Sequence, residues 1–370
     1  MNTLRFGLPL LVVIALASAC SSSSDAADDS PLPSSDAGVL DSGSTSDAST
    51  DDAGPIDAPA DTWTWVDVPG SKCANGSQTG FAVNPHAGTE NLVVYFEGGG
   101  GCASADSCWG ANPSATNLNG YDATTFAAAK QTKYPALDRT LASNPLKDMS
   151  FAYVPYCTGD LHAGTSEVDL ATDGGAPKPT SFWGAKDLDL FLARIVPTFA
   201  STNHVWLLGT SAGGFATFLD YDKVAHAFPG VRVDVIDDSG PPVEHKTGGD
   251  TAFTTWGITA PAGCSTCTTY RGFFDFDRQS RPETTFAFLS FTEDSTISLF
   301  FGYTPAEFEP VVTGFSSSIA SDPHAKTFLV TNAKDHVVES DLTLTSEVLP
   351  WIGQAVTDDP GWTDVTYAHP

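Results

Sequence analysis

The chain has 370 residues, with 45 Asp and Glu against 17 Lys and Arg, and its formal net charge is −28 at pH 7. This acidic balance argues against nucleic acid as a partner, because binding to phosphates depends on clustered Lys and Arg. It also disfavours a strongly anionic polymer as a binding partner, because like charges slow encounter at low salt.

The first twenty residues predict a targeting segment that is not part of the fold. Arg5 is its one positive charge, residues 8–16 are apolar, and small residues lead up to Cys20. This pattern is typical of a secretory signal with a lipobox, so we expect cleavage before Cys20 and lipidation of that cysteine. The alternative is an ordinary secretory signal with Cys20 removed or free. We therefore expect an exported protein, held by a lipid anchor at the cell surface or in the periplasm.

Residues 21–61 predict a disordered tether. The segment contains ten Asp, no Lys or Arg, and almost no large apolar side chain. It cannot bury enough surface to offset the entropy lost on ordering, and it lacks the ligand spacing of a calcium loop. The remaining residues, 62–370, are enough for one large domain with its own core.

Within this domain, short apolar runs rich in strand-forming residues alternate with helix-like stretches. The clearest helix is predicted over 185–199, where apolar residues recur at helical spacing. Several runs are continuously apolar, as expected for parallel strands buried on both faces. The alternation predicts an α/β domain with a parallel sheet. The runs lie at residues 92–96, 151–155, 205–208, 231–236, 286–289 and 328–330.

A run of four glycines, residues 98–101, directly follows the first of these apolar runs. Glycine lets a backbone approach a ligand closely and adopt positive φ. A glycine run is often only a flexible loop, but its place between a strand and Cys102 favours a rigid, functional one. We expect its backbone N–H groups to stabilise a developing oxyanion.

Six cysteines follow Cys20, an even number that suggests three disulfides in an exported chain. The simplest connectivity pairs near neighbours and leaves one long-range bridge. The Cys264-x-x-Cys267 spacing also suggests zinc or redox chemistry, but no second ligand pair has zinc spacing, which favours a structural bridge. The expected pairs are Cys102–Cys108, Cys264–Cys267 and Cys73–Cys157.

The segment Gly209-Thr-Ser-Ala-Gly213 ends an apolar run and precedes a helix-like stretch. A serine on such a sharp strand-to-helix turn is exposed as a nucleophile, and the flanking glycines keep side chains from colliding there. The N–H group of Ala212 can bind an oxyanion. The context favours a catalytic Ser211 over an ordinary Gly/Ser turn.

A nucleophilic serine needs a general base, and His336 is the best candidate. It follows the run 328–330 in a short polar loop, as expected for a residue at the carboxyl edge of a parallel sheet. The other histidines precede Ser211, lie in or close to the elbow, precede a strand or end the chain: His86, His162, His204, His226, His245, His324 and His369.

The base needs an orienting acid, and Asp294 follows the penultimate strand-like run. Asp238 or Asp237, after the strand that directly follows the elbow, is an earlier alternative. Glu293 and Asp335, which are next to Asp294 and His336 in the sequence, remain further candidates for the acid.

Taken together, these motifs resemble the pectin acetylesterase family over roughly residues 73–345. The resemblance implies an α/β-hydrolase-like fold, with a mostly parallel central sheet and helices on both faces, and hydrolysis of acyl esters. It implies Ser211 as nucleophile, Asp294 as acid and His336 as base, with Gly98, Gly99 and Ala212 as oxyanion donors. The matching segments are residues 97–102, 155–160, 208–214, 238–240, 294–295 and 335–336.

One residue departs from the family pattern. The family usually has Trp immediately before the cysteine of the glycine loop, and here that position is Gly101. The loss of a large aromatic side chain there is expected to widen or reshape the acyl pocket.

We therefore expect a surface-anchored serine carboxylesterase that requires no metal or organic cofactor. Its leading substrate is an O-acetyl group on a polysaccharide. One alternative is a lipase-like or general carboxylesterase that prefers longer acyl chains, with Trp109 and Trp183 lining its pocket. Another is a non-catalytic, glycan-binding surface lipoprotein. No feature favours a peptidase.

Overall fold

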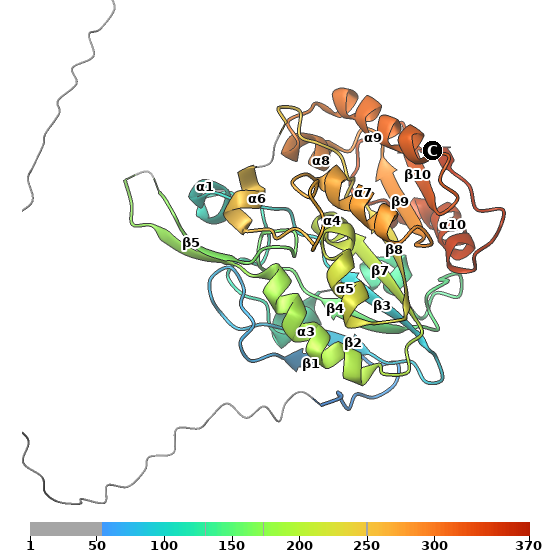
Figure 1. The fold of residues 1–370 in the computed structure, drawn as a ribbon, viewed down its shortest axis with the longest axis horizontal. Helices are drawn as coiled ribbons and strands as arrows, with labels where there is room; N and C mark the ends of the chain where they lie inside the picture. The colour runs from blue at the N-terminus through green and yellow to red at the C-terminus, as the bar shows by residue number, and fades with distance from the viewer. Residues whose placement is uncertain (1–53, 130, 173, 249–250) are drawn as a thin grey trace, which may run out of the picture. The chain divides into compact units, whose positions relative to one another are not determined.

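The computed structural model describes residues 54–129, 131–172, 174–248 and 251–370 (Figure 1). The expected signal segment 1–20, the lipidation of Cys20 and most of the expected tether 21–61 lie outside the described residues. None of the helices among the described residues has the length and apolar content needed to cross a bilayer.

The described strands form a nine-stranded sheet in the order β1-β2-β4-β3-β7-β8-β9-β10-β11. β1 and β2 pair in antiparallel fashion at one edge, β2 also pairs antiparallel with β4, and every pairing from β4 to β11 is parallel. Each of the six apolar runs lies in or at a strand of this sheet. The strands are β1 (Thr64–Asp67), β2 (Gly80–Asn84), β3 (Asn91–Phe96), β4 (Ser150–Val154), β7 (His204–Thr210), β8 (Arg232–Asp238), β9 (Phe286–Phe291), β10 (Ala325–Thr331) and β11 (Val365–Ala368). A separate hairpin joins β5 (Ser166–Leu170) and β6 (Lys178–Phe182).

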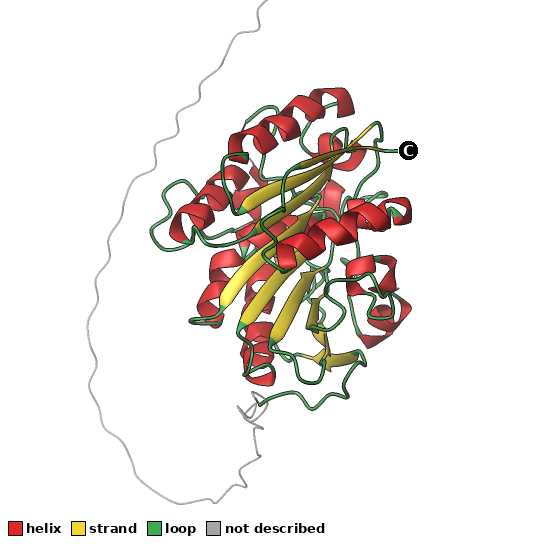
Figure 2. Ribbon diagram, turned by 90° about the vertical axis from the view of Figure 1, so that its right-hand side faces the viewer, coloured by secondary structure: helices red, strands yellow, loops and turns green. Residues whose placement is uncertain are grey.

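Helices cover both faces of the sheet (Figure 2), so the expected α/β-hydrolase-like architecture is confirmed. Successive side chains along β7 belong to two different apolar cores. Val205 and Leu207 lie in the core that also contains residues of α3, α4, α5, α7 and α9. Trp206 and Leu208 lie in the core that also contains residues of α2 and α10. This alternation explains the continuously apolar runs, because both faces of each central strand are buried. The helices are α1 (Ala105–Trp109), α2 (Ala123–Ala128), α3 (Gly184–Thr198), α4 (Ala212–Leu219), α5 (Tyr221–Ala227), α6 (Thr251–Trp256), α7 (Tyr270–Ser280), α8 (Ser295–Phe300), α9 (Pro305–Ile319) and α10 (Thr345–Val356).

The packed chain begins before residue 62. The backbone N–H group of Ile56 donates to Thr198 Oγ1 at 2.9 Å, and the carboxylate of Asp61 lies 2.7 Å from His86 Nδ1. The Asp- and Ala-rich composition of this segment did not predict these contacts, because they are made by a backbone N–H group and one carboxylate.

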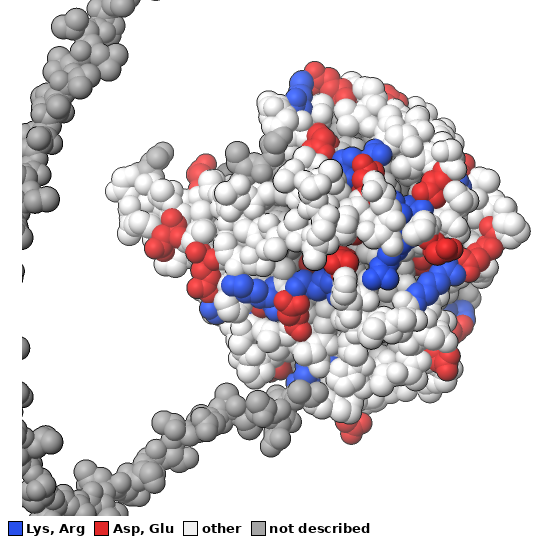
Figure 3. Space-filling model, in the orientation of Figure 1, with Lys and Arg blue, Asp and Glu red and all other residues white. Residues whose placement is uncertain are grey.

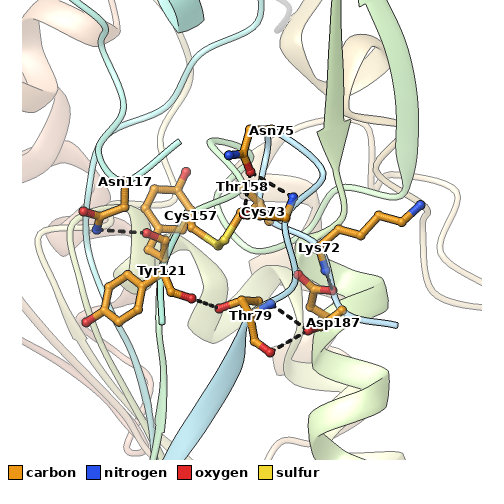
Figure 4. Close-up of a disulfide and its surroundings, with 12 residues drawn as sticks. Lys72, Cys73, Asn75, Thr79, Asn117, Tyr121, Cys157, Thr158 and Asp187 are labelled. Atoms are coloured by element: carbon orange, nitrogen blue, oxygen red, sulfur yellow. Dashed lines mark hydrogen bonds between the residues drawn. A yellow bond between two sulfur atoms is a disulfide. The ribbon is translucent and has the colours of Figure 1, made fainter. Parts of the chain in front are cut away.

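Three disulfides join Cys73 to Cys157, Cys102 to Cys108 and Cys264 to Cys267. The first, shown in Figure 4, ties the segment before β2 to the segment after β4. Beside it, the backbone N–H group of Ala74 donates to Cys157 O at 2.8 Å. These are the pairs that the spacing favours, and disulfides of this kind are typical of an oxidising compartment.

On the face of the described residues shown in Figure 3, Lys and Arg side chains lie beside Asp and Glu rather than forming a separate basic patch. Two of the ion pairs are Arg232–Asp358 and Lys246–Glu307, each at 2.7 Å. This distribution gives a nucleic acid no basic surface on that face.

Candidate active site

Ser211 occupies a sharp turn between β7 and α4, with φ of 56° and ψ of −119°. Such a conformation is rare for a residue with a side chain, and it persists here because the flanking glycines allow close packing. A Cβ atom on Gly209 would lie 1.9 Å from Gly213 O, and one on Gly213 would lie 2.0 Å from Phe96 O. The turn is thus the strand-to-helix elbow that the sequence predicts.

Ala212 opens α4, where the first backbone N–H groups have no acceptor within the helix. The positive end of the helix dipole adds to this local preference for an anion. The Ala212 N–H group therefore lies next to Ser211 in a region suited to negative charge.

The glycine loop after β3 lies directly against this elbow. A Cβ atom on Gly98 would lie 2.4 Å from Thr210 O and 3.1 Å from the Cβ atom of Ser211. β3 pairs with β4 on one side and with β7 on the other, so the strand order reverses here. Open α/β sheets bind ligands at the carboxyl edge of such a switch point.

Buried polar groups that the sequence analysis did not single out brace the glycine loop. Tyr156 N–H donates to Glu97 Oε2 at 3.0 Å, and the Tyr156 hydroxyl donates to Gly100 O at 2.8 Å. His162 Nε2 lies 2.8 Å from Glu97 O. Burial lowers the pKa of His162 to about 4, so its imidazole is neutral near pH 7 and donates to this carbonyl. Tyr156 lies in the matching segment 155–160 and Glu97 in the segment 97–102, whereas His162 lies in neither. Their spacing along the chain does not reveal the bracing role.

Asp294 and His336 meet at the same edge of the sheet. Asp294 Oδ2 lies 2.7 Å from His336 Nδ1, and Asp294 Oδ1 accepts from the backbone N–H groups of Thr296 and Ile297 at 2.8 Å each. Asp294 is fully buried. The hydrogen bond at Nδ1 leaves Nε2 as the basic nitrogen of a neutral ring. Nε2 is buried and has no hydrogen-bond partner within the described part of the chain.

Ser211, Asp294 and His336 follow β7, β9 and β10, which lie in one parallel stretch of the sheet. The carboxyl ends of parallel strands share an edge, so the topology brings the three loops to one side of the sheet.

Asp238, the alternative acid, contacts a different part of this site. Its carboxylate accepts from the backbone N–H groups of Val338 and Glu339 at 2.8 and 2.7 Å. Asp335 Oδ1 accepts from His336 N–H at 2.9 Å, and Glu293 lies 3.6 Å from Lys334. Among these carboxylates, the oxygen at hydrogen-bonding distance from the His336 ring is that of Asp294.

A cavity of about 230 Å³ opens beside Ser211 and Ala212. Its wall is largely apolar and aromatic, and includes Leu161, Phe215, Trp256, Tyr270, Phe300 and Phe301. His245 also lines it and stacks on Phe301, with 4.2 Å between ring centroids.

Gly101 forms part of this wall. A Cβ atom there would lie 3.6 Å from the Trp256 ring, whose Nε1–H group donates to Cys102 O at 2.7 Å. The Trp256 indole, from α6, thus packs against Gly101, the position at which the family usually has Trp.

Trp109 and Trp183 do not line the cavity, so the prediction that they form an acyl pocket is wrong. Trp109 Nε1–H donates to Thr180 Oγ1 at 2.8 Å, and the Trp183 ring lies 3.8 Å from Lys72 Nζ. Both rings are engaged elsewhere. Among the described residues, no group of three or more His, Cys, Asp or Glu side chains is arranged to hold a metal ion.

Comparison with known proteins agrees with this architecture. The curated relatives include palmitoleoyl-protein carboxylesterases of Xenopus laevis: notum1′ is 25% identical over 175 residues and notum1 is 26% identical over 181 residues. Each alignment covers 45% of this chain and 34% of the relative, so the matched region spans about a third of those proteins. The solved structure of the Wnt deacylase Notum from Drosophila matches with a TM-score of 0.54 and 18% identity, over 75% of this chain and 86% of that one. This structural match supports the fold.

The family assignment rests on a longer sequence match. Residues 62–256 match the sequence profile described as pectinacetylesterase, which is more than half of the chain. Four of the matching segments lie within this range: the glycine loop, the segment 155–160, the elbow and the segment 238–240. The chain therefore belongs to the pectinacetylesterase family of carboxylic ester hydrolases.

Proposed function

We propose that the protein is a serine carboxylesterase in which Ser211 is the nucleophile, His336 the general base and Asp294 the acid that orients the base. The observation that carries this proposal is the 2.7 Å contact of His336 Nδ1 with Asp294. It leaves a buried Nε2, which has no partner among the described residues, at the sheet edge that bears Ser211. Catalytic hydrogen bonds are often long in ligand-free structures and tighten when substrate binds.

In the proposed reaction, His336 Nε2 takes the Ser211 hydroxyl proton as Oγ attacks the ester carbonyl carbon. The tetrahedral intermediate collapses when the protonated imidazole gives that proton to the leaving alcohol. His336 then takes a proton from the water that attacks the acyl carbon, and it returns this proton to Ser211 Oγ as the bond to Oγ breaks and the carboxylic acid leaves. Asp294 keeps the imidazole in the productive tautomer and stabilises its protonated form.

The backbone N–H groups of Ala212, Gly98 and Gly99 are the proposed donors to the oxyanion. Support comes from the close packing of Gly98 on the elbow and from the position of Ala212 at the start of α4. Loss of one such donor typically lowers kcat by about 10²–10³.

The family supports our leading substrate, an O-acetyl group on a polysaccharide. The cavity favours a second candidate, an ester with a longer apolar acyl chain. A dry cavity of about 150 Å³ in another protein binds benzene, whereas the cavity beside Ser211 measures about 230 Å³. Each buried methylene contributes roughly 0.8 kcal/mol, so an aromatic-lined pocket rewards chain length. The palmitoleoyl substrate in the relatives' names agrees with this second candidate.

We also propose that the enzyme is exported and anchored to a membrane through Cys20. The disulfides support export, because such bridges persist in oxidising compartments. The remaining alternative, a non-catalytic glycan-binding lipoprotein, predicts that neither the protein nor a variant with a substituted triad residue hydrolyses an ester.

The experiment that tests the function is hydrolysis of p-nitrophenyl esters with acyl chains from C2 to C16, by the protein and by its Ser211→Ala variant. We expect activity that the substitution abolishes while the melting temperature stays unchanged. A C2 optimum supports the acetylesterase, and an optimum at longer chains supports the second candidate. If both folded proteins are inert on every ester, the triad proposal fails and the binding protein becomes the better account.

A further inference from the structure

Ser211 and His336 follow strands that are not neighbours in the sheet. β8 and β9 separate β7 from β10 in the sheet, so no backbone pairing directly fixes the loop of the proposed base relative to the elbow. A general base works only when it is held within hydrogen-bond reach of the nucleophile. Some other group must therefore connect the two loops.

Asp238, the last residue of β8, makes that connection. Its backbone carbonyl accepts from Ser211 N–H at 2.8 Å. Its side-chain Oδ1 and Oδ2 accept from the N–H groups of Val338 and Glu339 at 2.8 and 2.7 Å. The Ser239 hydroxyl also donates to Oδ1, at 2.8 Å. One residue thus bonds to the nucleophile's own backbone and to the two residues that follow His336 and Val337.

We propose that Asp238 is a positioning residue of the esterase, which holds the His336 loop against the Ser211 elbow by accepting the Val338 and Glu339 N–H groups. This inference rests on the proposed function, because it assigns a role in the same reaction. It gives Asp238 no contact with the reacting atoms.

The strained backbone at Val337 explains why the His336 loop needs these hydrogen bonds to Asp238. Val337, between His336 and the bonded Val338, has φ of 61°, which is a genuine outlier for a β-branched residue. Strained residues persist only where their surroundings over-determine them. The two bonds to Asp238 begin at the very next residue, so they oppose relaxation of Val337 and a shift of the His336 ring.

Charge makes these bonds strong. Asp238 is fully buried, which raises the pKa of its carboxyl group, but the hydrogen bonds from Val338, Glu339 and Ser239 favour the ionised carboxylate. Hydrogen bonds to an ionised acceptor are roughly twice as strong as neutral ones. Asn at this position would remove the charge and turn an amide NH₂ group toward a backbone donor.

The neighbouring Asp237 offers a matched control. It is also buried at the end of β8, and its Oδ1 accepts from Gly240 N–H at 2.8 Å. Burial raises the pKa of Asp237 well above its usual range and so favours its uncharged form. Asn replaces it with the same shape and keeps the acceptor oxygen.

The test compares Asp238→Asn and Asp237→Asn at pH 8 on a p-nitrophenyl ester that the protein hydrolyses. Because Asp238 does not line the acyl cavity, its loss should leave KM within about threefold. A misplacement of about 1 Å at a catalytic group costs on the order of 10² in rate, so we expect kcat to fall about 100-fold in Asp238→Asn. Asp237→Asn should keep kcat within about threefold.

A second measurement needs no activity. Hydrogen exchange of the Val338 and Glu339 amides should be at least tenfold faster in Asp238→Asn than in the protein itself or in Asp237→Asn. If Asp238→Asn retains kcat and both amides stay protected, the inference is overturned. Equal losses of kcat in Asp238→Asn and Asp237→Asn, together with a raised KM, would also overturn it, because they indicate a general packing defect. If the protein hydrolyses no ester but the two amides are released, the proposed function fails while the link made by Asp238 stands.

Discussion

Asp294 shares its two carboxylate oxygens between His336 and a helix. Oδ2 lies 2.7 Å from His336 Nδ1, while Oδ1 accepts from the Thr296 and Ile297 N–H groups in the first turn of α8. The residue that orients the proposed base is therefore fixed by the helix that it caps. A side chain that keeps the cap but changes the group facing His336 separates these two roles.

The substitution Asp294→Asn separates the capping of α8 from the orientation of His336. Asn is as good an N-cap as Asp, so we expect the melting temperature to change little. Its NH₂ group would face Nδ1 and favour the wrong tautomer, a change that costs about 10⁴ in kcat in Ser-His-Asp enzymes. Steady-state kinetics and thermal unfolding check both parts. A variant that retains more than a tenth of the activity would remove Asp294 from the triad.

The substitution Gly98→Ala tests the glycine loop. The added Cβ atom would lie 2.4 Å from Thr210 O, so the loop must move away from the elbow. We expect kcat to fall by about 10²–10³, as when one oxyanion donor is lost. Gly314→Ala is the control, because its Cβ atom meets nothing within 4 Å, and it should leave kcat unchanged. Similar rates in the two variants would argue against this loop as the oxyanion site.

The substitution Gly101→Val tests the acyl cavity. Its Cβ atom fits at ordinary contact distance, 3.6 Å from Leu161 and Trp256, and its methyl groups extend toward the cavity that Gly101 lines. We expect kcat/KM on a C8 ester to fall at least tenfold more than on the C2 ester, since filled space excludes the longer chain. Equal effects on the two esters would show that acyl chains bind elsewhere.

A pH dependence of stability follows from Glu339. Its side chain is buried, and burial, followed by the charge of Asp238, raises the pKa of its carboxyl group from 4.5 to about 8. The folded state therefore binds more protons than the unfolded state between these values, and its stability falls as pH rises through that window.

The variant Glu339→Gln keeps the neutral form at every pH. It should gain stability over the parent protein as pH rises from 5 to 8.5, as measured by urea unfolding at both values. The same difference at both pH values would contradict the raised pKa.

The disulfides are expected to contribute unequally to stability. Cys73–Cys157 closes a loop with a sequence separation of 84, and Cys264–Cys267 one with a separation of 3. Chain entropy predicts a loss of about 4.6 kcal/mol when the first bridge is replaced by two serines and about 2 kcal/mol for the second. Denaturant unfolding of the two double variants checks the order, and a larger loss for the short bridge would contradict it.

The sequence predicted six strands of the sheet, β3, β4, β7, β8, β9 and β10, because they are buried on both faces and so read as apolar runs. The outer strands β1 and β11 and the β5–β6 hairpin gave no such signal, because their residues are partly exposed and polar. Ser211, Asp294 and His336 were found because each follows a strand closely, which is a local feature. Their catalytic roles stay predictions.

The cavity and the bracing contacts depend on tertiary structure. Trp256 reaches Cys102 across 154 positions of the chain, and no spacing distinguishes it from Trp109 or Trp183. Asp238 was correctly placed near the site but was considered only as an acid, because its partners are backbone N–H groups on a distant loop. Such backbone partners leave no trace in the side-chain pattern.

The measurement that tests the central claim most directly is covalent labelling of the protein with a fluorophosphonate, followed by mass mapping of the adduct. We predict one adduct, on Ser211, formed together with loss of ester hydrolysis and formed far more slowly in the His336→Ala variant. An adduct on another serine, or full hydrolysis after Ser211 is labelled, would contradict the account.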